Sequence, residues 1–149
     1  MGRILIAEDE ASVRRLLSHL LVEEGHEVAV ARDGAAALQR LRANPPDMLI
    51  LDLMMPEVDG YQVLEELQEM GVLGIRTIVV SARGGEADVE RSLALGACHH
   101  MVKPFDPDEF LREVDSFLQL SPEEIHERQE DERDRAHLLS QLESLFGPD

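Results

Sequence analysis

The sequence has few aromatic residues and a single cysteine. Of its 149 residues only 3% are aromatic, and tryptophan is absent. Cys98 cannot form an internal disulfide, and its small neighbours Gly96 and Ala97 suggest a buried filler rather than a reactive thiol. These features favour a reducing, cytoplasmic setting.

Basic residues are also scarce, and no long apolar run is present. The chain has 14 Lys and Arg against 31 Asp and Glu, which gives a net charge of -17. A nucleic acid would be repelled by this charge, and no basic stripe offsets it. The apolar run at residues 4–7 is too short for a signal peptide or a membrane span, and Ile6 stands where a myristoylation signal requires Ser or Thr. We therefore expect neither nucleic-acid nor membrane binding.

Hydrophobic residues make up 44% of the chain, enough for the core of one domain. Short apolar runs alternate with segments of helical period, and the runs occupy residues 4–7, 28–31, 48–51, 77–80 and 101–102. Five strands, each followed by a helix, predict a doubly wound parallel sheet. In such sheets ligands bind beyond the carboxyl ends of the strands.

Polar residues follow four of these strands directly. Glu8 and Asp9 follow the first, Asp52 the third, Ser81 the fourth and Lys103 the fifth. Three carboxylates at one edge would raise one another's pKa unless a cation lay among them. The donors are all oxygens, without His or Cys, so the sequence predicts a Mg²⁺ site.

Lys103 and Ser81 add a cation and a hydroxyl donor at the same edge. Beside a metal-bound carboxylate, they would form a pocket for a small dianion such as a phosphoryl group. Any one aspartate at a strand end, Asp9 or Asp52 alone, is more often a helix cap or a turn former. The agreement of all five positions favours the site.

On these residues the chain resembles the receiver domains of two-component response regulators. The motifs are the acidic pair Glu8-Asp9, the segment LDLMMPEVDG around Asp52, Ser81-Ala82 and VKPF around Lys103. The resemblance covers residues 3–120 and implies a flavodoxin-like doubly wound five-stranded parallel sheet of order 2-1-3-4-5. Residues 1–120 would form the receiver, and residues 121–149 an acidic, helical C-terminal extension.

The resemblance also implies roles for individual residues. Asp52 would accept a phosphoryl group from a histidine kinase or a phosphotransfer protein, with Lys103 and Ser81 contacting that group. Mg²⁺ would be held by Asp9, Asp52 and the backbone carbonyl of Met54, with Glu8 acting through bound water. The chain would catalyse its own phosphoryl transfer and autodephosphorylation, yet serve as a signalling module rather than an enzyme.

One position departs from the family pattern. Three residues before Lys103 the family usually has Tyr or Phe as a switch that turns inward with Ser81, and here that residue is His100. A histidine can fill the slot but adds a group that changes charge near neutral pH, whereas a half-exposed structural histidine is the alternative. The resemblance further implies a cis peptide bond before Pro104.

The tail begins with Ser121-Pro122-Glu123-Glu124, which predicts a capping box and a sixth helix ending at Phe146, before Gly147-Pro148. We expect its first half to be a solvated, charged helix. An apolar stripe follows in its second half, at Leu138, Leu139, Leu142, Leu145 and Phe146. That stripe could dock on the receiver, pair with a second copy or hold a partner, and a frayed tail is the alternative.

The tail is too short for an output domain, so we expect a stand-alone receiver that signals to a downstream protein target by a changed surface. A homodimer could form through the C-terminal helix or through the face made by the fourth helix, fifth strand and fifth helix.

Other functions are less well supported. A haloacid-dehalogenase-type Mg²⁺-dependent phosphohydrolase needs an aspartate where Met54 stands, and FMN binding would meet an acidic first loop and few rings. A constitutive adaptor receiver would not need every site position filled.

Overall fold

The computed structural model describes residues 2–71 and 74–146. Its five strands form one parallel sheet in the order β2-β1-β3-β4-β5, which confirms the predicted topology. The strands are β1 (Arg3–Ala7), β2 (Glu27–Ala31), β3 (Met48–Leu51), β4 (Arg76–Ser81) and β5 (His99–Val102). All run in one direction, so their carboxyl ends meet at one edge of the sheet.

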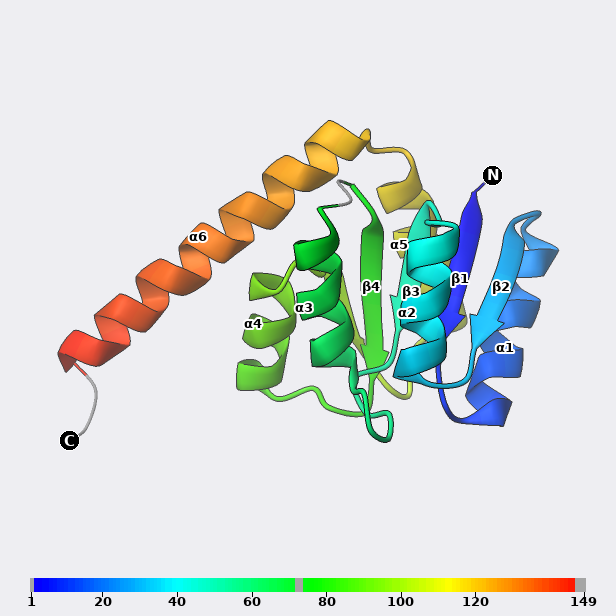
Figure 1. Ribbon diagram of the computed structural model, residues 1–149, viewed down its shortest axis with the longest axis horizontal. Coiled ribbons are helices and arrows are strands. Elements are labelled where there is room, and N and C mark those ends of the chain that lie inside the picture. Colours follow the sequence, from blue (N-terminus) through cyan, green and yellow to red (C-terminus); the bar gives the residue numbers. More distant parts are fainter. Residues whose placement is uncertain (1, 72–73, 147–149) are drawn as a thin grey trace.

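Five helices cover the two faces of the sheet (Figure 1). They are α1 (Ala11–Glu23), α2 (Gly34–Ala43), α3 (Gly60–Met70), α4 (Glu86–Ala94) and α5 (Pro107–Leu118). The core on the α2, α3 and α4 side is separate from the core on the α1 and α5 side. Along β1, Leu5 enters the first core and Ile4 and Ile6 the second, because successive side chains of a strand point to opposite faces. Both faces of the central strands β1, β3 and β4 are buried, which explains their continuous apolar runs.

Short polar residues start three of these helices. Asp33 accepts a hydrogen bond from the Ala36 amide at 2.8 Å at the start of α2, and Asp106 caps α5 in front of Pro107. At α3, Asp59 and Gln62 form a reciprocal capping box. These caps fix where each helix begins after the loop that leaves the carboxyl edge of the sheet.

A sixth helix, α6 (Pro122–Phe146), leaves the opposite edge of the sheet and runs past α4 (Figure 1). The predicted capping box is present, since the Glu124 amide donates to Ser121 Oγ at 3.1 Å and the Ser121 amide to the Glu124 carboxylate at 3.2 Å. The predicted stop at residues 147–148 lies outside the described residues. No helix among the described residues has the length and apolar character needed to span a membrane.

The expectation that the first half of α6 is solvated is wrong for its inner face. Ile125 is fully buried and belongs to the core on the α1 and α5 side. Pro122 packs so closely on Gly74 that a Cβ there would lie 2.6 Å from the Pro122 Cβ. The sequence pattern did not predict this contact of α6 with the core, because it depends on a single isoleucine among charged residues. The apolar stripe farther along the helix is exposed.

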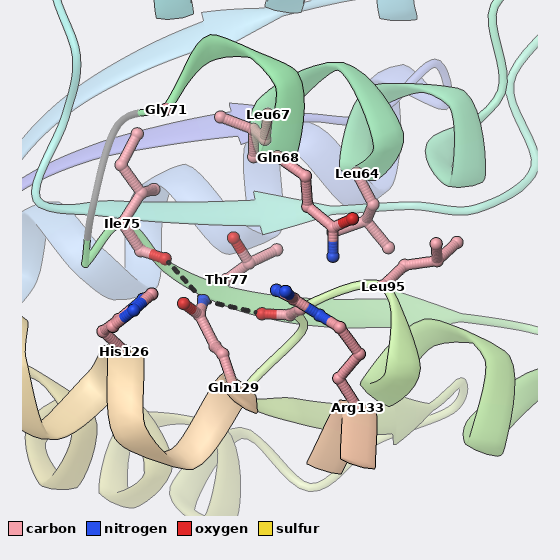
Figure 2. Close-up of a pocket in the computed structure, with 11 residues that line it drawn as sticks. Leu64, Leu67, Gln68, Gly71, Ile75, Thr77, Leu95, His126, Gln129 and Arg133 are labelled. Carbon is pink, nitrogen blue, oxygen red and sulfur yellow. Dashed lines mark hydrogen bonds between the residues drawn. The ribbon is translucent and has the colours of Figure 1, made fainter. Parts of the chain in front are cut away.

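Gln129 supplies the polar part of the same attachment. Its side-chain amide donates to the Gly96 carbonyl at 2.8 Å and to the Ile75 carbonyl at 3.4 Å (Figure 2). One side chain thus joins α6 to two backbone segments, one before β4 and the other after α4.

A buried arginine holds the chain between α5 and α6 at this edge. Arg76 is only 9% exposed, and its guanidinium donates to the carbonyls of Phe117 at 2.8 Å, Asp47 at 3.3 Å and Leu120. The three carbonyls belong to two segments of the chain, one just before β3 and the other at the end of α5. Arg76 therefore ties the amino end of β4 to the α5–α6 connection.

Candidate functional site

The strand register brings the acidic residues together at the carboxyl edge. Ala7 pairs with Leu51, so the residues that follow them, Glu8 and Asp52, lie side by side. The Asp52 amide donates to the Ala7 carbonyl at 3.0 Å and extends this pairing past the end of β3. Parallel pairing of β1 and β3 thus carries two carboxylates into the same position.

Three carboxylates and one ammonium form the centre of the site. Ligand oxygens of Glu8, Asp9 and Asp52 all lie within 4.8 Å of one another. The Lys103 ammonium donates to Glu8 Oε1 at 2.5 Å and to Asp52 Oδ2 at 3.3 Å. Glu8 and Asp52 are only 1% and 5% exposed, whereas Asp9 faces solvent. One cation therefore serves two buried acids, and negative charge remains in excess.

This excess changes the protonation of the cluster. Burial, reinforced by the neighbouring Asp52 carboxylate, raises the pKa of Glu8 from 4.5 to about 7, although Lys103 acts in the opposite direction. Burial alone would lower the pKa of Lys103, but its hydrogen bond to Glu8 and the charge of Asp52 outweigh burial and raise it. The ammonium therefore stays charged, and a cation bound among the carboxylates would favour the ionised form of Glu8.

The loop after Asp52 is positioned by backbone contacts. The Met54 amide donates to Asp52 Oδ1 at 3.1 Å and fixes one oxygen of that carboxylate. Gly60 lies so close that a Cβ would come within 2.5 Å of the Asp52 carbonyl, and a Cβ on Gly34 would come within 2.1 Å of the Val58 carbonyl. Two glycines thus let the loop pack directly on Asp52 and on the start of α2.

Ser81 lies at the carboxyl end of β4, and His100 lies within β5, two residues before its carboxyl end. Ser81 is fully buried, and its hydroxyl accepts from the Arg83 amide at 3.2 Å. His100 Nε2 lies 2.7 Å from the Arg83 carbonyl, and Nδ1 lies 2.8 Å from Ser92 Oγ on α4. Since a carbonyl only accepts, Nε2 carries a proton. His100 thus points toward α4 and bridges α4 to the loop after β4.

The structure brings Glu8, Asp9, Asp52 and Lys103 into one cluster. Among the side-chain hydrogen bonds of residues 2–71 and 74–146, none joins Ser81 or His100 to that cluster, whereas the Lys103 amide donates to the Ser81 carbonyl at 2.9 Å. The Lys103–Pro104 peptide bond is cis. His99 packs on Phe117 with ring centroids 6.1 Å apart, away from the Ser92 contact of His100.

Two further groups at this end of the sheet were missed from the sequence. Arg14 on α1 donates to the Glu8 carbonyl at 2.8 Å and so holds the acidic loop by its backbone. Tyr61 on α3 donates to Asp88 Oδ1 on α4 at 2.6 Å, and the Arg91 guanidinium lies 3.9 Å above its ring. Burial and the Asp88 hydrogen bond raise the pKa of Tyr61 to about 12. Arg14 stands one helical turn past the acidic pair, but no sequence signal links Tyr61 to Asp88.

The donor set suits a hard divalent cation. The clustered ligand atoms are carboxylate oxygens, one acid faces solvent, and three carboxylates stand against the one ammonium of Lys103. Mg²⁺ binds through one or two carboxylates and keeps several waters, which matches a cluster open at Asp9. The residues therefore fit Mg²⁺.

A family model of the response regulator receiver domain matches residues 4–115, which include every residue of this cluster. The chain belongs to this family. Receiver domains of this family function in two-component signalling, and the folded core described above is such a domain.

Relatives and solved structures agree with this assignment. The chain is 36% identical over 117 residues to the chemotaxis protein CheY of Bacillus subtilis, across 78% of this chain and 97% of that protein. It is 41% identical over 122 residues to the probable transcriptional regulator ycf27 of Galdieria sulphuraria, across 77% of this chain but only 47% of that protein. The chain thus spans about half the length of that relative.

Among solved structures, the receiver domain of the Francisella response regulator 1452 superposes with a TM-score of 0.76 at 27% identity. The match covers 80% of this chain and 98% of that one. The receiver fold therefore accounts for most of this chain.

Proposed function

We propose that this receiver accepts a phosphoryl group on Asp52 from a histidine kinase or a phosphotransfer protein. The observation that best supports this proposal is that the Lys103 ammonium forms ion pairs with both Glu8 and Asp52, in a cluster where negative charge is in excess. An Asp52 oxygen attacks phosphorus as the bond from phosphorus to the donor nitrogen breaks, and an aspartyl phosphate results. Most of the catalysis is positioning and charge stabilisation.

Each residue has a defined part in this step. Lys103 moves from its shared position to pair with the new phosphoryl oxygens, and the Met54 amide keeps the Asp52 carboxylate oriented. Mg²⁺, bound by Asp9, Asp52 and the Met54 carbonyl with Glu8 acting through water, would neutralise the developing oxygen charge. Ser81 turns from the Arg83 amide to donate its hydroxyl proton to the phosphoryl group.

We further propose that His100 reports this movement of Ser81. His100 and Ser81 bond the same residue, Arg83, at its carbonyl and its amide. A shift of Arg83 would therefore alter the His100 contact with Ser92 on α4, and the face of α4, β5 and α5 would change for a downstream protein target. Residues 1–120 act as the receiver, and residues 121–149 are an appended acidic segment.

Intact-mass spectrometry tests the proposal. With Mg²⁺ and a small acyl-phosphate or phosphoramidate donor, the wild-type protein should gain one phosphate, and the Asp52→Asn variant none. Asp59→Asn is the matched control, because Asp59 lies in the same loop yet caps α3, a role that asparagine also fills. That control should be labelled like the wild type.

Two results would contradict the proposal. Labelling of Asp52→Asn would place the phosphate on another residue. Turnover of many donor molecules without an accumulating adduct would instead favour the alternative of a Mg²⁺-dependent phosphohydrolase.

A further inference from the structure

The outer half of α6 exposes a cluster of large apolar side chains. The exposed fractions are 56% for Leu138, 38% for Leu139, 42% for Leu142, 75% for Leu145 and 82% for Phe146. In Figure 1 this part of the helix projects beyond the domain. Apolar side chains gathered in this way on a surface commonly mark an interaction site.

A groove between α4 and α6 adjoins this cluster. Its volume is about 220 Å³, and its apolar lining comes from Leu93, Ala136 and Leu139. Leu139 belongs to both the groove and the exposed cluster. The groove therefore continues onto the outer half of α6, and we call the two together the α4–α6 surface.

The polar lining of the groove is mainly acidic. It consists of three glutamates, Glu90, Glu132 and Glu143, against one arginine, Arg135, and one serine, Ser140. Among the ion pairs of the described residues, none involves any of the three glutamates. The apolar lining of the groove, flanked by glutamates that form no ion pair within the described residues, is complementary to a ligand that presents apolar and cationic groups together.

We propose that the α4–α6 surface binds a cationic amphipathic helix of a partner protein. Leucine-type side chains of the helix would lie on Leu93, Leu139 and the outer apolar cluster, and its lysines or arginines would lie beside the glutamates. Residues 136–146 span about 16 Å, which matches about three turns of a partner helix. This is the groove mode by which amphipathic helices are commonly recognised.

Charge decides against a second copy of this chain as the occupant. The whole chain carries a net charge of -17, and residues 136–146 contain one glutamate and no lysine or arginine. A second copy would bring the same groove lining, in which one arginine, Arg135, stands against Glu90, Glu132 and Glu143, so acids would face acids. The proposal goes beyond the phosphorylation of Asp52, and its test requires no phosphate.

A peptide titration tests the proposal directly. The probe is a peptide of about 18 residues with leucines and one tryptophan on one helical face and lysines on the other. The protein has no tryptophan, so the peptide's fluorescence reports binding without background. We expect saturable binding with a blue shift, weakened roughly fivefold or more as salt rises from about 50 to about 300 mM.

Matched variants locate the binding surface. Leu139→Gln should weaken binding roughly tenfold, whereas Val22→Gln, on an exposed valine of α1, should leave it unchanged. The pair Glu90→Lys and Glu143→Lys should together weaken binding roughly tenfold, whereas Glu24→Lys at the end of α1 should have little effect. Circular dichroism would verify that each variant is folded.

Several outcomes would overturn the proposal. Equal losses for Glu24→Lys and for the groove variants would mean non-specific attraction to an acidic protein. Equal affinity for a peptide with glutamates in place of the lysines would show that charge complementarity has no role in binding. Equal affinity for a scrambled peptide without an apolar face would show that the apolar groove has none. Sedimentation showing a dimer that Leu142→Gln dissociates, without peptide binding, would make a second copy the occupant.

Discussion

The two edges of the sheet differ in how their buried charged groups are paired. At the amino edge, Arg76 is buried and donates to three carbonyls. At the carboxyl edge, Lys103 is shared between Glu8 and Asp52, with Asp9 close by. Arg76 has its hydrogen-bonding capacity largely used, whereas the acids exceed the cations near them.

The difference separates a structural group from a functional one. A buried polar group that only supports the fold is stabilised by using its hydrogen bonds. The acidic cluster keeps unmatched charge, and burial together with the neighbouring Asp52 carboxylate raises the pKa of Glu8. Replacing residues at the two edges should therefore change stability in opposite directions.

The largest effect is expected at the amino edge. Arg76→Ala removes one donor from each of the Phe117, Asp47 and Leu120 carbonyls and opens a gap between β4 and the start of α6, so the free energy of unfolding should fall by about 3 kcal/mol. Urea denaturation measures this loss. The folded variant should still gain one phosphate from a small donor, and a loss below about 1 kcal/mol would show that Arg76 is not the tie described here.

At the carboxyl edge, burial favours the neutral form of Glu8 over its ionised form in the absence of metal. Because the pKa of Glu8 is raised from 4.5 to about 7, the stability that its neutral form contributes is present below the lower value and is lost as pH rises through the higher one. Glu8→Gln stays neutral. Between these two pH values the wild type should lose about 1–2 kcal/mol more than Glu8→Gln, after allowance for solvent screening.

Denaturation curves of both proteins at several pH values, recorded with a chelator, measure this difference. Parallel pH profiles would show that Glu8 titrates at its ordinary value, and the contrast between the two edges would then weaken.

Mg²⁺ should reduce the same excess charge. At about ten times its dissociation constant, Mg²⁺ should stabilise the wild type by about 1 kcal/mol. Asp9→Asn should abolish most of this gain, and Asp59→Asn should keep it. Thermal denaturation with and without Mg²⁺ gives the answer, and equal gains in both variants would place the ion elsewhere.

Tyr61 offers the smallest and most specific test, because it is the single tyrosine and its hydrogen bond to Asp88 is satisfied. Ultraviolet absorbance should show the phenol titrating near pH 12, where its pKa is raised to about 12 from 10.0. Since the neutral form is favoured in the fold, its small contribution to stability is lost as pH rises through this range. Asp88→Asn should lower the midpoint toward 10.0, and an unchanged midpoint would contradict the role given to Asp88.

Much of the fold follows from the sequence because its apolar runs are unambiguous. The strand at residues 48–51 was predicted with its observed bounds, and the end of α3 at Gly71 follows from the left-handed backbone that this glycine adopts, with φ of 68°. The cluster of Glu8, Asp9 and Asp52 was also predictable, since parallel strands bring their carboxyl ends to one edge.

Other features depend on contacts that no local pattern encodes. Ile125 docks α6 although charged residues surround it, while the obvious apolar stripe stays exposed. The pairing of Lys103 with Glu8 as well as Asp52 depends on side-chain reach across the sheet. The direction of His100 toward Ser92 likewise depends on the placement of α4.

The two close approaches at Gly34 and Gly60 make the loop after Asp52 a backbone-defined element. No side chain could be inserted at either contact without moving the loop, so its shape depends little on the exposed Met54 side chain, whereas the left-handed backbone of Glu57, with φ of 65°, restricts which residues fit there. Under the proposed function, the Met54 side chain could therefore be exchanged to favour a different phosphodonor while the Asp52 carboxylate stays in place.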